Sequence, residues 1–393
     1  MSDPWLSIIG LNEDSLDGLS PASRAALEDA DIVFGGPRHL ELAQVGAKGQ
    51  AWPIPFSTVP VLEHRGQKVA VLASGDPFWH GAGGSLVRDL KQGEWRAFPA
   101  PSTFTLAASV LGWRMEDITC HGLHAAPLAR LRGVLSPYGR MICLMRDGDA
   151  PAELAQWLCD EGAGAATLTV MECLGGPRER LRAVQADGFD LSDIVAPVAV
   201  AVALPAKVGI SRASGLPDDS FANDGQITKR PVRALTLSAL APRGGELLWD
   251  IGAGSGSISI EWCLAGGRAI AFEQHTERSA NIVQNIDDFG LSHRMTCITG
   301  IAAEAILDQE TPDAVFIGGG ARKPLLEKLY GLLPAGTRLV ANGVTLETEA
   351  LLAQEHAAKG GALMRFDIAQ ATPLGPMRGW NASRPIVQWS VTL

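Results

Sequence analysis

The sequence predicts an α/β protein built from two halves. Short apolar strands alternate with helical stretches along nearly all of its 393 residues, a pattern that indicates parallel sheets. That length is too great for one ordinary hydrophobic core. A stretch dense in Gly, Ser, Asp and Pro over 207–225 is typical of a linker. We therefore expect a first domain over 1–206, a linker over 207–222 and a second domain over 223–393.

In the first half, apolar runs mark the strands and longer amphipathic runs mark the helices. The predicted strands are Leu6–Ile9, Ile32–Phe34, Val69–Leu72, Met141–Leu144, Thr167–Met171 and Pro197–Ala203. The predicted helices are Pro21–Ala30, Gly83–Lys91, Thr103–Leu111 and Pro151–Glu161.

The second half repeats the alternation without being a copy of the first. Its predicted strands are Leu247–Trp249, Ala269–Phe272, Met295–Ile298, Ala314–Ile317, Arg338–Ala341, Ala362–Ile368 and Ile386–Val391. Helices fill the gaps, except that only a loop separates the sixth strand from the seventh. Two final strands without an intervening helix indicate a hairpin at the edge of the sheet.

Composition excludes several classes of function. The net charge of −10 argues against nucleic-acid binding, which needs clustered Lys and Arg. The sequence contains no run of eighteen apolar residues, and its first residues lack an export signal. The six cysteines form no Cys-x-x-Cys pair, so we expect free thiols, no metal site and a cytoplasmic location.

The strongest local motif joins a strand to a helix in the second half. Asp250-Ile-Gly252-Ala-Gly254-Ser-Gly256 follows an apolar strand and precedes a helical run. Glycines there let a ligand approach the backbone, and the helix N-terminus supplies free N–H groups. Glu273 ends the next strand, where a carboxylate can accept hydrogen bonds from both hydroxyls of a ribose.

Two ligands suit such a turn, and the residues discriminate between them. A dinucleotide site favours G-x-G-x-x-G, whereas position 257 is Ser257. Asp250 is unhelpful beside a pyrophosphate but favourable beside the ammonium and sulfonium of S-adenosylmethionine. The motif therefore favours S-adenosylmethionine, against the alternative of a glycine turn without a ligand.

The order of elements in this half resembles the seven-stranded, Rossmann-like fold of class I methyltransferases. The resemblance implies that Thr228 contacts the carboxylate of the methyl donor, and that Gly300 and Ala302 lie beside its adenine. Many members have an acidic residue after the equivalent of Gly300, where this chain has Ile301.

The first half contains a weaker signal. Ser74-Gly75-Asp76-Pro77 follows a strand and, taken alone, is an ordinary turn. A second loop, Phe98-Pro-Ala-Pro-Ser102-Thr103, precedes an apolar helix, which Ser102 or Thr103 can cap while facing a ligand. A third stretch, Met171–Arg180, ends a later strand.

Together these three stretches resemble the tetrapyrrole methylases, whose two α/β subdomains hold S-adenosylmethionine in a cleft. The resemblance implies that Gly75, Asp76 and Pro77 contact the donor. The first loop differs from the G-x-G-x-G of that family, because Gly10 is followed by Leu-Asn-Glu-Asp.

The combination of both halves is similar to the decarboxylating precorrin-6B methyltransferases of cobalamin (vitamin B12) biosynthesis. Further matching stretches are Gly35-Gly-Pro-Arg-His-Leu, Asp224-Gly-Gln-Ile-Thr-Lys-Arg-Pro-Val-Arg and Ile317-Gly-Gly-Gly-Ala-Arg322. The resemblance implies one S-adenosylmethionine per domain. It also implies methylation of ring carbon 5 by the first half, and methylation of carbon 15 with loss of the ring C acetate carboxyl, giving precorrin-8, by the second.

A polycarboxylate substrate needs cationic groups around its rim. Our candidates are Lys229, Arg230, Arg233, Arg322 and Lys323, with solvated surface charge as the alternative. We assign no catalytic acid or base, expect a homo-oligomer, and expect no nucleic-acid or membrane partner. The alternative functions are an RNA or protein methyltransferase with an N-terminal recognition module, and a non-catalytic subunit.

Overall fold

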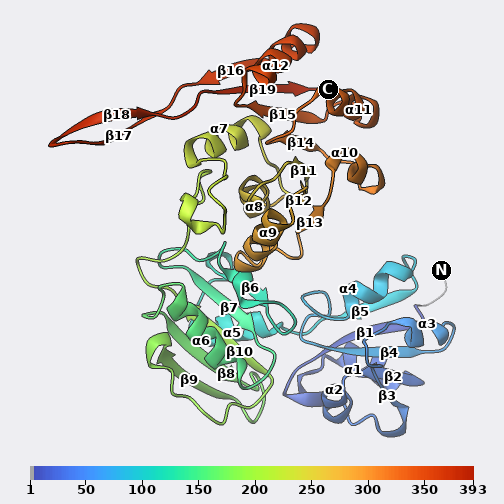
Figure 1. The fold of residues 1–393 in the computed structure, drawn as a ribbon. Helices are drawn as coiled ribbons and strands as arrows, with labels where there is room; N and C mark the ends of the chain where they lie inside the picture. The colour runs from blue at the N-terminus through green and yellow to red at the C-terminus, as the bar shows by residue number, and fades with distance from the viewer. Residues whose placement is uncertain (1–3) are drawn as a thin grey trace. The chain divides into compact units, whose positions relative to one another are not determined.

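A computed structural model describes residues 4–393 and divides the chain into two compact units. The first unit comprises the chain up to Leu128 together with Val134–Gly209, and the second comprises Ala129–Gly133 together with Ile210–Leu393 (Figure 1). Within the part of the chain that the structure describes, no helix is long and apolar enough to cross a membrane.

The first unit opens with a parallel five-stranded sheet in the order β3-β2-β4-β1-β5. Its central strands are buried on both faces, as the continuous apolar run of β4 requires. The strands are β1 (Leu6–Leu11), β2 (Ile32–Gly35), β3 (Gly49–Ala51), β4 (Val69–Ser74) and β5 (Trp95–Phe98). The helices are α1 (Pro21–Glu28), α2 (Pro37–Leu42), α3 (Val59–Glu63) and α4 (Gly83–Leu86), the last shorter than predicted.

The second sheet of this unit corrects the prediction of parallel sheets. Its order is β6-β7-β10-β8-β9, and only the β6–β7 pair is parallel. The turn after β8 is too short for a crossover helix, so β9 returns antiparallel. The strands are β6 (Thr119–Gly122), β7 (Arg140–Leu144), β8 (Thr167–Glu172), β9 (Arg180–Gln185) and β10 (Val198–Ala203). Helices α5 (Thr103–Leu111) and α6 (Ala150–Asp160) complete this part.

The second unit contains a seven-stranded sheet in the order β13-β12-β11-β14-β15-β19-β16. Its first five strands are parallel, and β19 is antiparallel to both neighbours. The strands are β11 (Leu247–Ile251), β12 (Arg268–Glu273), β13 (Met295–Thr299), β14 (Ala314–Ile317), β15 (Arg338–Gly343), β16 (Ala362–Phe366) and β19 (Ile386–Thr392).

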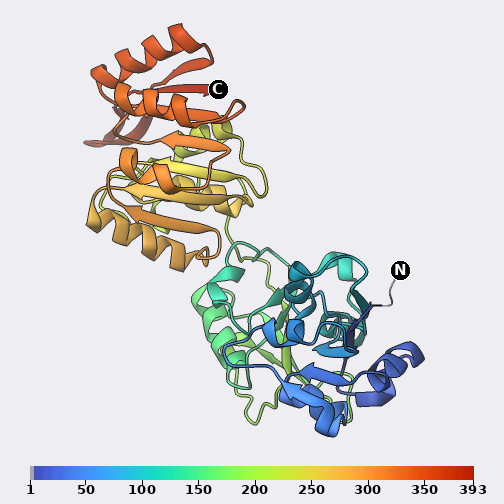
Figure 2. The ribbon, with the colours of Figure 1, turned by 90° about the vertical axis from the view of Figure 1, so that its right-hand side faces the viewer.

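Helices cover both faces of this sheet (Figure 2). Adjacent residues of β11 serve opposite cores: Leu248 packs with Trp262 of α8, and Trp249 packs with Leu326 of α11. The helices are α7 (Arg230–Leu240), α8 (Ser257–Leu264), α9 (Thr276–Asp288), α10 (Ala302–Ala305), α11 (Lys323–Leu332) and α12 (Leu346–Lys359).

Two segments of the second unit differ from the prediction. Most of the stretch predicted as a linker over 207–222 packs into the second unit, where Leu216 and Phe221 join the core and the N–H groups of Gly215 and Leu216 donate to the buried Glu261 carboxylate. Where only a loop was predicted before the last strand, β17 (Ala369–Leu374) and β18 (Met377–Ala382) form a hairpin that extends from the sheet (Figure 1).

Candidate functional site

The glycine motif forms the predicted turn between β11 and α8. Gly252, Gly254 and Gly256 have φ angles of +68°, +60° and +72°, which L-residues with a side chain rarely adopt. A Cβ on Gly252 would lie 2.7 Å from the carbonyl oxygen of Gly319, in the loop after β14. The turn therefore brings two loop backbones together at the carboxyl ends of the central strands, where ligands bind in open α/β sheets.

Glu273, at the end of β12, holds the turn in place. Its Oε2 accepts from the N–H of Gly254 at 2.9 Å, and its Oε1 accepts from the N–H of His275 at 3.0 Å. The side chain is nearly buried and lines a cavity. The carboxylate thus fixes the backbone around the cavity and also faces it.

Asp250 lies beneath the turn and is fully buried. Its Oδ2 accepts from the Ser259 hydroxyl at 2.7 Å, while its Oδ1 has no hydrogen-bond partner within residues 4–393. Burial raises the pKa of this carboxyl to about 7, and the nearby Glu273 charge adds to the rise. A cation nearby would favour the ionised carboxylate, which agrees with the preference inferred from the sequence.

The cavity of the second unit has a volume of about 510 Å³. Among the predicted residues it brings together Gly252, Glu273, Gly300, Ala302 and Arg322. His275, expected from the sequence either near the adenosine or exposed, also lines the cavity. Two lining residues that the sequence reasoning missed are Gln274, directly after β12, and Arg278, in the first turn of α9. Their only sequence signal is their position just after the strand that ends in Glu273.

Other predicted donor contacts surround this cavity without being part of its lining. Gly254 and Gly256 form the turn, and Asp250 is buried beneath it, outside the lining. Ile301, which stands where many class I members have an acidic residue, does line the cavity and is exposed. Thr228 is half-buried, and its carbonyl accepts from Arg233.

The predicted substrate contact Arg233 is corrected by the structure. Its side chain is fully buried, where Nε donates to Glu261 at 2.6 Å and Nη2 donates to Asp218 at 3.1 Å. These bonds hold the former linker against α7, so the guanidinium cannot reach a substrate carboxylate. A buried charge that is already paired serves structure.

The remaining cationic candidates lie at helix starts. Lys229 and Arg230 are exposed at the beginning of α7. Lys323 begins α11 and lies 4.0 Å from Glu327. Of the five candidates, Arg322 alone is among the residues that line the described cavity.

The first unit has its own cavity, with a volume of about 350 Å³. Ser102 and Thr103 line it, and the Ser102 hydroxyl caps α5 by accepting from the N–H of Thr105 at 3.1 Å, as predicted. Gly75 has a φ of +56°, and a Cβ there would lie 2.8 Å from Cα of Ser102. The two predicted loops therefore pack against each other beside the cavity.

Asp76 stabilises the Gly-Asp-Pro loop from within. Its Oδ1 accepts from the N–H of Phe78 at 2.8 Å, an Asx turn. Gly75, Asp76 and Pro77 are not in the lining, although Ser74, just before them, and Trp79, two positions after them, are.

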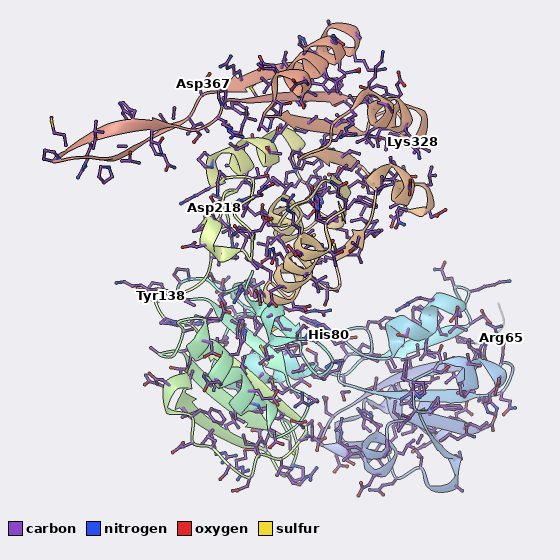
Figure 3. The ribbon with its side chains drawn as sticks, viewed as in Figure 1. Arg65, His80, Tyr138, Asp218, Lys328 and Asp367 are labelled. Atoms are coloured by element: carbon purple, nitrogen blue, oxygen red, sulfur yellow. The ribbon has the colours of Figure 1, made fainter. Side chains whose placement is uncertain are left out.

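Sequence reasoning missed most of the polar lining of this cavity. Glu13, Arg38, His39 and His80 all contribute to it, and His80 is labelled in Figure 3. The stretch Gly35-Gly-Pro-Arg-His was noted for its resemblance alone, without a role for its side chains.

Each of the two α/β units has a glycine loop beside a cavity. Together with the families that the two halves match, this arrangement defines a tandem methyltransferase. The family described as "Tetrapyrrole (Corrin/Porphyrin) Methylases" matches residues 6–189, and "Precorrin methyltransferase domain" matches residues 219–393.

Full-length relatives specify the family further. Precorrin-6Y C(5,15)-methyltransferase (decarboxylating) from Sinorhizobium sp is 46% identical, covering 99% of this chain and 96% of the relative. The protein of the same name from Mycobacterium tuberculosis (strain ATCC 25618 / H37Rv) is 40% identical, covering 98% and 99%. This chain belongs to the decarboxylating precorrin-6Y C(5,15)-methyltransferase family.

Solved structures also resemble parts of the chain, and one example corresponds to the second half. The C-terminal domain of precorrin-6Y C5,15-methyltransferase from Rhodobacter capsulatus is 60% identical. The match covers 47% of this chain and 100% of that one, with a TM-score of 0.46.

Proposed function

We propose that this enzyme methylates a reduced tetrapyrrole at ring carbons 5 and 15 and removes the carboxyl group of the ring C acetate, in cobalamin biosynthesis. The substrate is the one predicted as precorrin-6B, named precorrin-6Y in the relatives, and the product is precorrin-8. The observation that carries the proposal is the match to relatives of this activity along both halves of the chain.

The methyl donor is S-adenosylmethionine, with one molecule in each unit. When bound, it supplies an electrophilic methyl group on a sulfonium. In the second unit, the unpartnered Oδ1 of Asp250 and the crowded backbone at Gly252 fit a cationic ligand that approaches closely. Glu273 would accept from its ribose, with Thr228, Gly300 and Ala302 as the further contacts that the resemblance implies.

In the first unit, Gly75, Asp76, Pro77, Ser102 and Thr103 would surround the donor. Both units then act mainly by orientation and exclusion of water, because an enamine-like meso carbon is already a nucleophile. After methylation at carbon 15, the conjugated ring can accept the electrons released by acetate decarboxylation. Arg322, which lines the cavity, would hold a carboxylate of the substrate, with Lys323, Lys229 and Arg230 as the further cationic groups proposed around its rim.

Three further parts of the proposal concern architecture. The strand order of the second unit supports a Rossmann-like class I methyltransferase fold, and the two sheets of the first unit support the two-subdomain tetrapyrrole methylase fold. We place the catalytic domains at 1–206 and 223–393. We also propose a homo-oligomer, supported by the apolar side chains that the β17–β18 hairpin exposes.

Incubation of the purified chain with S-adenosylmethionine and precorrin-6B tests the activity. We expect a product that has gained two methyl groups and lost one carbon dioxide by mass spectrometry. Calorimetry adds a second criterion. Tight uptake of a nicotinamide dinucleotide, with no affinity for S-adenosylmethionine, would contradict the assignment of the glycine turn.

A further inference from the structure

The cavity of the first unit contains a polar cluster that the proposed function does not yet use. Arg38 and His39 project from α2, and Ser74 ends β4. Arg38 Nη2 lies 3.0 Å from His39 Nε2 and 2.9 Å from Ser74 Oγ, and His39 Nε2 lies 2.9 Å from the same oxygen. All three residues line the cavity.

His39 fixes the orientation of the arginine. Burial, and then the charge of Arg38, lowers the pKa of His39 to about 4, so its imidazole is neutral near pH 7. An arginine only donates hydrogen bonds, so a neutral His39 Nε2 can accept from it. This contact and the one to Ser74 hold one edge of the guanidinium.

Glu13 sets the charge of the cluster. This carboxylate is 7% exposed and pairs with Arg38 on one side and with Arg178, at 3.1 Å, on the other. Two guanidiniums around one carboxylate leave one net positive charge at the cavity wall. That charge favours an anion.

Arg38 retains donors for such an anion. A guanidinium has five N–H groups, and the contacts to Glu13, His39 and Ser74 use three of them. The Arg38 side chain remains 32% exposed, and Ser74 is exposed beside it. Ser74 also directly precedes Gly75, the first residue of the proposed donor loop.

We propose that Arg38, oriented by His39 and assisted by the Ser74 hydroxyl, binds a carboxylate within the cavity of the first unit. The inference rests on the proposed function of that unit, because both reactants carry such a group. One source is the methionine portion of the methyl donor, and the other is an acetate or propionate side chain of the tetrapyrrole.

The full-length Arg38→Gln variant tests the assignment and distinguishes the sources. In carbon 5 methylation, loss of a charge-assisted contact raises one of the two KM values by about 10- to 100-fold, namely that of the reactant whose carboxylate Arg38 binds. A rise for S-adenosylmethionine identifies the donor as the source, and a rise for the tetrapyrrole identifies the substrate. Arg38→Lys, which keeps the charge but not the fork of donors, recovers part of the loss.

Two controls separate binding from damage to the fold. Arg65→Gln breaks a pair with Glu94 at 2.8 Å outside the cavity lining and leaves both KM values unchanged; Arg65 is labelled in Figure 3. Arg38→Gln alone removes one of the two partners of the buried Glu13 carboxylate. The double variant Glu13→Gln, Arg38→Gln also removes that charge, so it tests binding without this source of destabilisation. Carbon dioxide release reports separately on the second unit.

Both KM values within twofold of wild type, in the single and the double variant, would overturn the proposal. Calorimetric titration of wild type and Arg38→Gln with S-adenosylhomocysteine and with the tetrapyrrole measures the same contact without turnover. The inference therefore stays testable even if wild type does not methylate carbon 5, a result that refutes the proposed function of the unit instead.

Discussion

Gly252 is restricted by two independent constraints, its backbone conformation and the approach of the loop after β14. Its φ of +68° is costly for alanine, and the added Cβ would lie 2.7 Å from Gly319 O. Backbone atoms cannot rotate away as a long side chain could. The substitution must therefore displace one of the two loops.

Gly252→Ala should lower the stability of the second unit by about 1–3 kcal/mol and weaken binding of S-adenosylmethionine to that unit. Thermal unfolding and calorimetry measure the two effects. Gly244→Ala is the matched control, since a Cβ there has no heavy atom within 4 Å among the described residues. Equal donor affinity in both variants would contradict a role for the turn in donor binding.

If the proposed donor contact is right, we expect Asp250 to make donor binding depend on pH. Its folded pKa, about 7, lies above the ordinary value of 3.8, so the carboxyl is protonated below pH 7. A cationic donor favours the ionised form, and its affinity should therefore rise with pH up to about 7 and then level off.

Asp250→Asn tests this dependence because asparagine has a similar shape and does not titrate. Calorimetry between pH 5.5 and 8.5 should show that the variant binds S-adenosylmethionine more weakly at the second unit. Its affinity there should no longer rise with pH. In the ligand-free protein, by contrast, Asp250→Asn should increase the free energy of unfolding. A raised pKa costs stability as pH increases from about 4 to about 7, and asparagine removes that cost. An identical affinity profile for wild type and variant would exclude Asp250 as the group responsible.

At the scale of elements, hydrogen bonds hold the segment before α7 against the glycine turn. Asn285 of α9 accepts from the N–H of Ala222 at 2.8 Å and donates to the carbonyls of Ala222 and Ser255. A Cβ on Gly254 would lie 3.2 Å from Gln226 O, so the segment passes close to the turn.

An ion pair at the surface also joins the segment before α7 to α9. Asp224 accepts from Nε of Arg278 at 2.8 Å, which lowers the pKa of that carboxyl, and Arg278 lines the cavity. Asp224→Asn should raise the donor KM about 2- to 5-fold, as expected for a partly exposed pair. Exchange of the charges, Asp224→Arg with Arg278→Asp, should restore the affinity in part.

Glu310→Gln provides the control for that pair. It breaks a bidentate contact with Arg268, at 2.6 and 2.8 Å, which lies in the same unit, is more exposed and does not line the cavity. Its donor KM should stay at the wild-type value. A comparable rise in both variants would show that the effect is general destabilisation.

Strands with continuous apolar runs were predicted with the most accurate bounds. β14 matches its predicted bounds, Ala314–Ile317, and β4 extends its prediction by two residues, because continuous apolar runs mark such strands. β9 and β17 were not predicted, since edge strands with polar or exposed side chains have no comparable pattern. The antiparallel pairing of β10 with β7 and β8 was missed for a different reason, because an apolar run marks a strand without showing the direction of its neighbours.

The glycine turn and Glu273 were predictable because they are adjacent to strongly patterned strands. Arg233 was assigned wrongly because its partners, Asp218 and Glu261, lie 15 and 28 residues away in sequence. The Arg38 cluster joins residues from a helix, a strand and a loop. The spacing of these residues along the chain does not show that their side chains come into contact.

At the scale of the whole molecule, the β17–β18 hairpin is unusually exposed. Leu374, Met377 and Trp380 are 68%, 75% and 80% exposed. An isolated two-stranded hairpin is marginally stable in water, and apolar side chains gathered on it are typical of an interface. Combined substitution of these three residues by Ser should reduce the oligomer mass measured by light scattering. An unchanged mass would place any interface elsewhere.

The division of labour between the units gives the broadest prediction. Gly75→Ala adds a Cβ 2.8 Å from Ser102 Cα at a φ of +56°, so it should impair the first unit alone. Its product should lack the methyl group at carbon 5 but still have lost carbon dioxide. Gly252→Ala should give the converse, a product methylated at carbon 5 that retains the acetate carboxyl. Mass spectrometry separates these products, and a mixture of the two variants should restore the full product if the intermediate is released into solution. Identical products from both variants would show that the two units do not act separately.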